Sequence, residues 1–259
     1  PVLSRGLGDV YKRQSPTFEG FDALIYDSEE ADGFEIGLKS NLFDNNMRIN
    51  ATYYKYEYTD LQVQLFDANI IQFSTFNAGA VETEGFEADM LWYTDIEGLT
   101  LRGQFAWTDA VNTGDFFNTS GVNLKGSERS YSPEIAGSLG LSYDSSLFSG
   151  WRYTFSTDAR YSDDYAWGVY RNSPRQDSYW INDAAISIYS EDGKHSINLI
   201  GRNLGDEIVI VTGGSTPGRI GTRTVPGIEA ALLQDQNVTT QQGRTCLLYT
   251  SPSPRDNTG

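Results

Sequence analysis

The sequence predicts an all-β fold, an antiparallel, up-and-down, transmembrane β-barrel segment of about eight strands. Three observations predict it. Apolar and polar residues alternate over segments of about ten residues, the connections between these segments are alternately short and long, and aromatic residues gather near the segment ends. Aromatic residues are 13% of the chain, which suits strands and interfacial belts better than a helical enzyme.

Each predicted strand carries apolar residues on one face and polar residues on the other. In the first, Phe34, Ile36 and Leu38 alternate with Glu35 and Lys39. Side chains along a strand point alternately to opposite faces, so this pattern gives one face suited to lipid and one suited to a wet interior. The same alternation marks eight segments in order, at 33–42, 47–53, 86–92, 99–107, 135–143, 151–161, 184–188 and 196–202.

The connections between these segments follow a regular rhythm. The short ones are 43–46, 95–98, 144–150 and 190–194, and the long ones run roughly over 57–80, 109–133, 162–178 and 205–240. Tight turns at one end of a sheet and extended connections at the other are typical of an outer-membrane β-barrel. We therefore expect short periplasmic turns and long extracellular loops.

A soluble carbohydrate-binding β-sandwich is an alternative, because its strands also alternate. The predicted strands are longer than the usual five or six residues of a sandwich, which favours the membrane. Aromatic residues near predicted strand ends match the girdles of a membrane barrel. They are Trp92, Tyr93, Trp107, Tyr143, Trp151 and Tyr161, and charges such as Glu87, Asp89, Arg102, Asp158 and Arg160 fall on the other face.

The long connections are also rich in aromatic residues. Among Asp, Asn and Ser, such side chains suit stacking on sugars or aromatic chelates, although ordinary packing of large loops explains each of them equally well. They are Tyr56, Tyr58, Phe73, Phe76, Phe116, Phe117, Tyr165, Trp167 and Tyr170.

Composition and single residues exclude several function classes. The net charge of −16 opposes a nucleic-acid partner, because a phosphate backbone would be repelled. The lone histidine, His195, stands at a short turn without the partners that a metal site or a catalytic triad needs. We therefore expect no catalytic residue, no metal ligand and no cofactor, and an outer-membrane lipase or protease is disfavoured.

The two ends of the chain do not resemble natural protein. Residues 4–14 can be encoded by a DNA string whose reverse complement, in a shifted frame, encodes residues 246–256. Such an inverted repeat looks like translated adaptor from a transposon-based sequencing library. The only cysteine, Cys246, lies in the second of these segments, so no disulfide or thiol chemistry is predicted.

Three domains follow from this interpretation: an adaptor-derived segment at 1–14, a partial receptor β-barrel at 15–245 and a second adaptor-derived segment at 246–259. We expect the adaptor-derived segments to be extended or irregular and to pack on little. The sheet should stay open, because its first and last partner strands are absent.

Three motifs occur in a fixed order. They are Tyr58-Thr59-Asp60-Leu61-Gln62, then Asn77-Ala78-Gly79 with Thr83-Glu84-Gly85-Phe86-Glu87, and finally Asn203-Leu204-Gly205-Asp206-Glu207. In order and spacing they resemble successive motifs in the late barrel of TonB-dependent outer-membrane receptors. The residues that carry the resemblance, with structural rather than ligand-binding roles, are Tyr58, Asp60, Leu61, Asn77, Ala78, Gly79, Gly85, Glu87, Asn203, Leu204, Asp206 and Glu207.

The resemblance implies a 22-stranded barrel, plugged by an N-terminal domain, in the outer membrane of a Gram-negative bacterium. Such a receptor imports a scarce nutrient, such as a ferric siderophore, cobalamin or a glycan fragment, with energy delivered by the TonB complex through its N-terminal part. Its other partners would be outer-membrane lipid and lipopolysaccharide. Compared with the family, we expect the plug, the TonB-contacting box and the final strand to be missing from this sequence. A complete, small eight-stranded outer-membrane adhesin or structural barrel is the second alternative.

Overall fold

The computed structural model describes residues 27–67, 72–117, 123–167, 175–220 and 234–252. The elements within these residues are β-strands, and the chain is all-β, as predicted. No helix in these ranges has the length and apolar character needed to cross a lipid bilayer.

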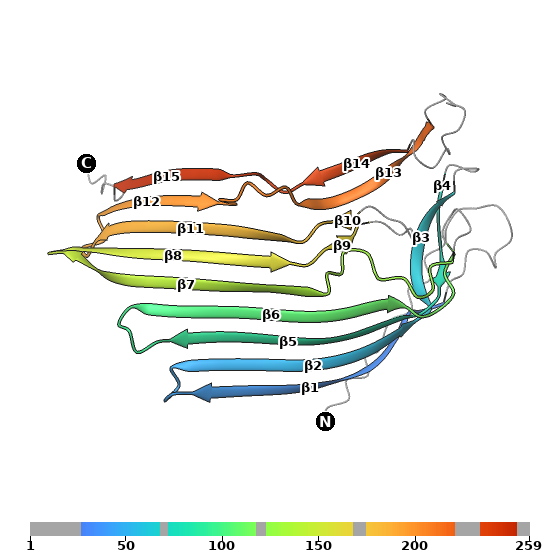
Figure 1. Cartoon of the computed structure of the whole chain (residues 1–259), viewed down its shortest axis with the longest axis horizontal. Coiled ribbons are helices and arrows are strands. Elements are labelled where there is room, and N and C mark those ends of the chain that lie inside the picture. The colour runs from blue at the N-terminus through green and yellow to red at the C-terminus, as the bar shows by residue number, and fades with distance from the viewer. Residues whose placement is uncertain (1–26, 68–71, 118–122, 168–174, 221–233, 253–259) are drawn as a thin grey trace, which may run out of the picture.

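One antiparallel sheet dominates the described residues, and its strands lie side by side in chain order (Figure 1). Small hairpins interrupt the chain between some of these strands without entering the sheet, so the topology is up-and-down. In spatial order, the nine strands of the sheet are β1 (Glu30–Leu42), β2 (Met47–Thr59), β5 (Val81–Tyr93), β6 (Leu99–Asn112), β7 (Ile135–Phe148), β8 (Trp151–Ser162), β11 (Tyr179–Ser190), β12 (His195–Arg202) and β15 (Thr245–Pro252).

Three of the four long connections contain a two-stranded hairpin rather than loop alone. All three hairpins lie at one end of the sheet, which we call the long-loop end; the short turns lie at the opposite, short-turn end (Figure 1). The hairpins are β3 (Leu61–Asp67) with β4 (Gln72–Ala78), β9 (Tyr165–Ala166) with β10 (Arg175–Gln176), and β13 (Ile210–Ile220) with β14 (Gln234–Thr240). The predicted rhythm of short and long connections therefore holds, but the long ones are more ordered than expected.

The sheet has an apolar face, which we call the outer face, and a polar inner face. The outer face is open: Ile36 is 68% and Leu139 62% exposed. A β-sandwich would cover such a face with a second sheet. The described strands leave it uncovered, as expected for a wall whose outer surface meets lipid.

Aromatic side chains border the outer face at both ends. At the long-loop end, the register sets Tyr53 opposite Phe86 and Phe86 opposite Trp107. At the short-turn end, the rings of Tyr143 and Tyr153 lie 6.0 Å apart between centroids. Of the residues predicted for aromatic girdles, Trp107 and Tyr143 lie in these borders.

Charges begin directly beyond the long-loop border. Lys55 Nζ lies 3.0 Å from Glu82 Oε1 and 3.3 Å from Glu84 Oε2, and the Tyr53 hydroxyl donates to Glu84 Oε1 at 2.8 Å. The apolar band of the outer face therefore ends directly beside the ion-paired residues Lys55, Glu82 and Glu84.

One expectation about the chain end is wrong. Segment 246–259 was expected to pack on little, yet Thr245–Pro252 forms β15 and pairs with β12 from Arg202↔Thr245 to His195↔Pro252. The free edge of β12 offers backbone donors and acceptors that any extended segment can bond, so the pairing needs no matched side chains. The sheet thus has nine strands instead of eight, but β1 and β15 each keep a single neighbour in it, so it stays open as expected.

Two of the short turns use a glycine in the left-handed conformation, and one of them also needs it for space. Gly98 and Gly150 both have positive φ, 81° and 76°. A Cβ at Gly98 would overlap the carbonyl oxygen of Asp144, whereas a Cβ at Gly150 would have nothing within 4 Å. The first turn therefore needs glycine for space as well as for conformation.

The variants Gly98→Ala and Gly150→Ala separate these effects. Both place alanine at positive φ, which costs roughly 1–2 kcal/mol, but only Gly98→Ala adds an overlap, worth about 1–3 kcal/mol more. We expect Gly98→Ala to lower the free energy of unfolding clearly further in urea titrations of the chain in detergent micelles. Equal losses for the two variants would contradict the packing argument.

Asp192 holds the turn between β11 and β12. Its carboxylate accepts hydrogen bonds from Ser190 Oγ at 2.7 Å and from the Lys194 amide at 3.1 Å, and it lies 3.2 Å from Lys194 Nζ. These contacts, that of Ser190 foremost, lower the pKa of Asp192 from 3.8 to about 2.

The pKa of Asp192 links this turn to pH. A carboxyl with a depressed pKa stabilises the folded state above its unfolded pKa, and that contribution disappears as pH falls from 3.8 towards about 2. In a carboxyl-carbon NMR titration, we expect the resonance removed by Asp192→Asn to titrate at about 2. A midpoint at the ordinary value of 3.8 would show that the turn contacts do not persist in solution.

Candidate functional site

The first two motifs meet at the base of the β3–β4 hairpin. Asn77 Nδ2 donates to the carbonyl oxygens of Asp60 at 2.5 Å and of Asp27 at 3.1 Å, and Asn77 Oδ1 accepts from the Asp27 amide at 2.8 Å. Asp60 bends the chain out of β2 with a φ of 54°, and Leu61 then pairs with Ala78. One amide side chain thus binds three backbone groups where the hairpin leaves the sheet.

Small residues of the same motifs permit close approach. A Cβ at Gly79 would lie 2.9 Å from the Gly114 carbonyl carbon, so the two backbones nearly touch there. A Cβ at Gly85 would overlap the ring of Tyr54, which crosses β5 so that its hydroxyl lies 3.1 Å from Thr108 Oγ1 on β6. The Tyr58 ring lies 6.2 Å from that of Tyr56.

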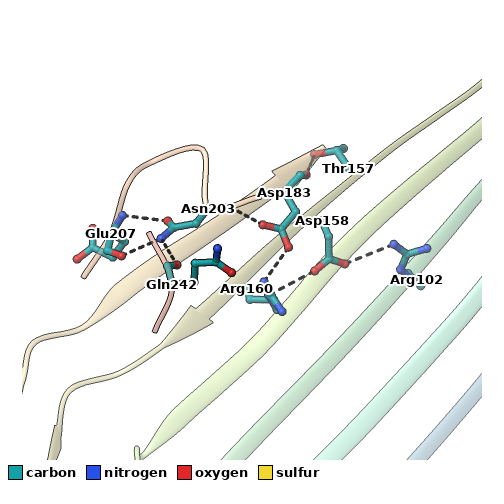
Figure 2. Close-up of polar contacts among 8 residues, drawn as sticks. All are labelled: Arg102, Thr157, Asp158, Arg160, Asp183, Asn203, Glu207 and Gln242. Carbon is teal, nitrogen blue, oxygen red and sulfur yellow. Dashed lines mark hydrogen bonds and ion pairs between the residues drawn. The ribbon is translucent and has the colours of Figure 1, made fainter. Parts of the chain in front are cut away.

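The third motif forms a tight loop after β12. Asn203 is 5% exposed and has a φ of 48°. Its Oδ1 accepts from the Glu207 amide at 2.9 Å, and its Nδ2 donates to the Glu207 carbonyl at 2.8 Å (Figure 2). Asp206, with a φ of 58°, donates its amide to the Asn203 carbonyl at 2.8 Å. Asn and Asp tolerate this left-handed conformation better than other side chains, so the motif chemistry fits the loop.

The remaining motif positions explain the local shape. Leu204 folds back over β12, where a Cβ at Gly201 would lie 2.6 Å from Leu204 Cδ2. Around Gly205, a Cβ would have nothing within 4 Å.

A chain of polar contacts runs from this loop across the inner face (Figure 2). The Asn203 amide donates to Asp183 Oδ1 at 2.7 Å, and Arg160 Nη2 donates to Asp183 Oδ2 at 2.8 Å. Arg160 Nε lies 3.8 Å from Asp158 Oδ1, and Arg102 Nη2 lies 3.5 Å from Asp158 Oδ2. We call Arg102, Asp158, Arg160, Asp183 and Asn203 the inner-face network.

Gly140 allows this network to cross β7. The register places Gly140 opposite both Arg102 and Asp158. A Cβ at Gly140 would overlap Nε of Arg102, so the guanidinium reaches Asp158 only because β7 has no side chain in between.

Beside the network, the inner face is hollowed to a volume of about 620 Å³. Its lining includes Asn50, Glu87, Asp89, Gln104 and Arg160. Asn50 Nδ2 donates to both carboxylate oxygens of Asp89, at 3.0 and 2.9 Å. Amide and charged groups of this kind can hydrate a passage or hold a polar partner, and no group of His, Cys, Asp and Glu suited to a metal ion occurs in the described ranges.

The structure does not gather the motif residues into one site. Glu87 lies in the hollow, the Asn77 group lies where β2 and β5 leave the sheet, and the Asn203 group lies beside β11 and β12. The sequence placed the charges of Arg102, Asp158 and Arg160 on a wet face, but it missed that they pair with one another and with Asp183.

Aromatic residues of the long connections divide between packing and exposure. Phe116, Tyr165 and Trp167 are buried, at 7%, 7% and 5% exposed, whereas Phe117 is 55% exposed. The Tyr165 hydroxyl donates to the Ile210 carbonyl at 3.0 Å, and burial, followed by the neighbouring Tyr179, raises the pKa of Tyr165 to about 12. The side chains of Phe73 and Phe76, and all of Tyr170, lie outside the described residues.

His195 lies far from the network, at the short-turn end. Its ring stacks on Trp151 with a centroid distance of 6.4 Å and an interplanar angle of 16°. This ring contact is the role that the structure gives His195.

The role of Gly140 can be tested with a matched control. Gly140→Ala should displace Arg102 and cost about 1–3 kcal/mol of unfolding free energy, whereas Gly103→Ala meets nothing closer than 3.8 Å and should cost less. In an Arg102→Ala background, the Gly140→Ala penalty should shrink. An unchanged penalty in that double-mutant cycle would show that Gly140 serves something other than the passage of Arg102.

The comparisons with known proteins agree with this geometry. The model of the family TonB dependent receptor-like, beta-barrel matches residues 6–204. The solved siderophore receptor PiuA from Acinetobacter baumannii aligns with a TM-score of 0.66 at 20% identity, over 90% of this chain and 30% of that one. The ferric yersiniabactin uptake receptor FyuA from Yersinia pestis gives 0.66 at 14% identity, over 87% and 30%.

A third solved structure, the ferric-catecholate import receptor Fiu from E. coli K12, gives a TM-score of 0.60 at 19% identity, over 91% of this chain and 29% of that one. The chain therefore spans less than a third of these receptors, and at such identities the likeness shows the fold alone. No curated protein matched the sequence. Because the family model covers most of the chain and the sheet has the fold of these receptors, the chain belongs to the family of TonB-dependent receptor β-barrels.

Proposed function

We propose that the intact protein is an outer-membrane active-transport receptor. It imports a scarce small-molecule nutrient with energy delivered through TonB, and the described strands form a late part of its barrel wall. The observation that carries the proposal is the two-faced sheet in a chain of this family: an exposed apolar face bordered by aromatic rows, and a polar inner face.

This proposal assigns each surface a partner. The outer face contacts lipid and, in the outer leaflet, lipopolysaccharide of a Gram-negative outer membrane. The short turns face the periplasm, and the hairpins of the long-loop end face outside. TonB acts through the N-terminal part of the receptor, and nucleic acid is no partner of a chain with a net charge of −16.

The nutrient is a ferric siderophore, cobalamin or a glycan fragment. Ferric siderophores are the first class to test, because the structures with this fold include PiuA, a siderophore receptor, and FyuA, a ferric yersiniabactin uptake receptor. The family consists of transporters rather than enzymes, and the proposed activity uses no catalytic residue.

The motif residues stabilise the barrel wall and do not bind the transported nutrient. The contacts of Asn77 and Asn203 with backbone groups support this structural role. The domain boundaries proposed at 15 and 245 depend on the codon relation between the chain ends. Neither the family match, which begins at residue 6, nor β15, which continues to Pro252, marks these boundaries.

Transport can be measured once the surrounding reading frame is recovered. The complete receptor would be expressed in a Gram-negative host that lacks its own siderophore receptors, with and without TonB. We expect TonB-dependent accumulation of radioactive iron from a ferric catecholate or hydroxamate, with radiolabelled cobalamin and labelled maltooligosaccharide as parallel probes.

Two results would contradict the proposal. One is accumulation of the probes that is unchanged without TonB. The other is a reading frame in which a signal peptide leads directly into Ser15 with no plug between, which would favour the small outer-membrane barrel instead.

A further inference from the structure

The chain leaves the sheet at the end of β12 and returns to the same place. It exits at Arg202, forms the β13–β14 hairpin, and re-enters opposite Arg202 at Thr245. The strand that adds to β12 therefore starts beside the loop that carries the third motif.

The motif loop binds the returning segment directly. Asp206 Oδ1 accepts from the Arg244 amide at 3.0 Å. Asn203 Nδ2 donates to the Gln242 carbonyl at 3.5 Å (Figure 2). Between these two contacts, a Cβ on Gly243 would lie 3.2 Å from Asp206 Oδ1, so a small residue favours the approach. A backbone hydrogen bond from the Gln241 amide to the Val209 carbonyl, at 2.8 Å, closes the base of the excursion.

The side chains of β15 supply little to fix its register. Leu248 is 67% exposed and Tyr249 51% exposed, and the half-buried Leu247, opposite Ile200, supplies one apolar pair. A strand held mainly by its backbone pairs nearly as well two residues out of register, because both faces are preserved by an even slip. The place where the strand enters must then decide the register.

The geometry points to Asn203 and Asp206 as positioning residues. We propose that they form a clamp that sets the register in which the strand after Arg244 joins β12, whatever the sequence of that strand. The inner-face contact between the Asn203 amide and Asp183 anchors the clamp to β11, so the wall already built fixes the position of the strand added next. This inference does not depend on the transported nutrient or on TonB.

The thiol of Cys246 reports the register in the full 259-residue chain. In the observed pairing, Cys246 lies opposite Gly201, and after a slip of two residues it would lie opposite Leu199. Gly201→Cys therefore detects the observed register, and Leu199→Cys detects the slipped one. The nearest atoms to a Cβ at position 201 are at the flexible end of Leu204, and the Ala184 carbonyl oxygen lies at an ordinary contact distance of 3.8 Å.

The clamp is removed with Asn203→Gly and Asp206→Gly. Glycine keeps the positive φ of both positions without strain, so the change deletes the side-chain contacts alone. After oxidation in detergent micelles, trypsin should release peptide 195–202 linked to peptide 245–255, which mass spectrometry quantifies for each reporter.

With the clamp intact, we expect the 201–246 linkage to dominate. Without it, the ratio of the 201–246 to the 199–246 linkage should fall by about fivefold for each hydrogen bond lost. As a single substitution, Asp206→Asn keeps an acceptor for the Arg244 amide and should leave the 201–246 to 199–246 ratio as high as in the unchanged chain. Asp206→Gly alone should lower the ratio. An unchanged ratio in the double glycine variant would overturn the proposal.

A separate pair checks that the wall itself survives. Ile186 and Leu199 lie opposite each other on β11 and β12, so Ile186→Cys with Leu199→Cys, in a Cys246→Ser background, should link equally well with and without the clamp. Loss of this linkage together with the 201–246 linkage would mean that the motif only holds β12 in place, and this too would overturn the proposal.

Discussion

The register of the antiparallel pairs is the constraint on which the whole structure depends. Side chains alternate along every strand, so a shift of one residue in any pair would turn polar groups to the outer face and apolar groups to the inner face. The register aligns the border row Tyr53–Phe86–Trp107 and, on the other face, the row that places Arg102, Gly140 and Asp158 side by side. The outer and inner faces therefore keep their apolar and polar character only while every strand pair holds its register.

The same chemistry recurs where long connections leave the sheet. Asn77 and Asn203 each bind backbone groups from two separate segments, and each is combined with an acidic residue at positive φ, Asp60 and Asp206. A side-chain amide has both donors and an acceptor, so it can satisfy backbone groups that the sheet ladder no longer pairs. In this chain, the motifs therefore act as anchors at the bases of the hairpins.

Much of the fold followed from local patterns, whereas contacts that depend on neighbouring strands did not. Alternation along 99–107 or 151–161 is visible in the chain itself, and so are the turn residues at 43–46 and 95–98. The pairing of Arg160 with Asp183 requires the register between two strands, which neither strand encodes alone. The need for glycine at 140 is set by Arg102 on the adjacent strand. The strand at the chain end was not predicted because it pairs mainly through its backbone. The alternation of apolar and polar side chains carries no information on such backbone pairing.

Tyr54 and Arg102 belong to a group of long inner-face side chains that lie flat across a neighbouring strand. Each does so over a glycine, Gly85 in one case and Gly140 in the other. Side chains laid along the wall do not project from it, so the free bore of a barrel built this way is governed by where its glycines stand. A wall of this kind can carry large aromatic and cationic groups and still leave clearance for whatever occupies its interior.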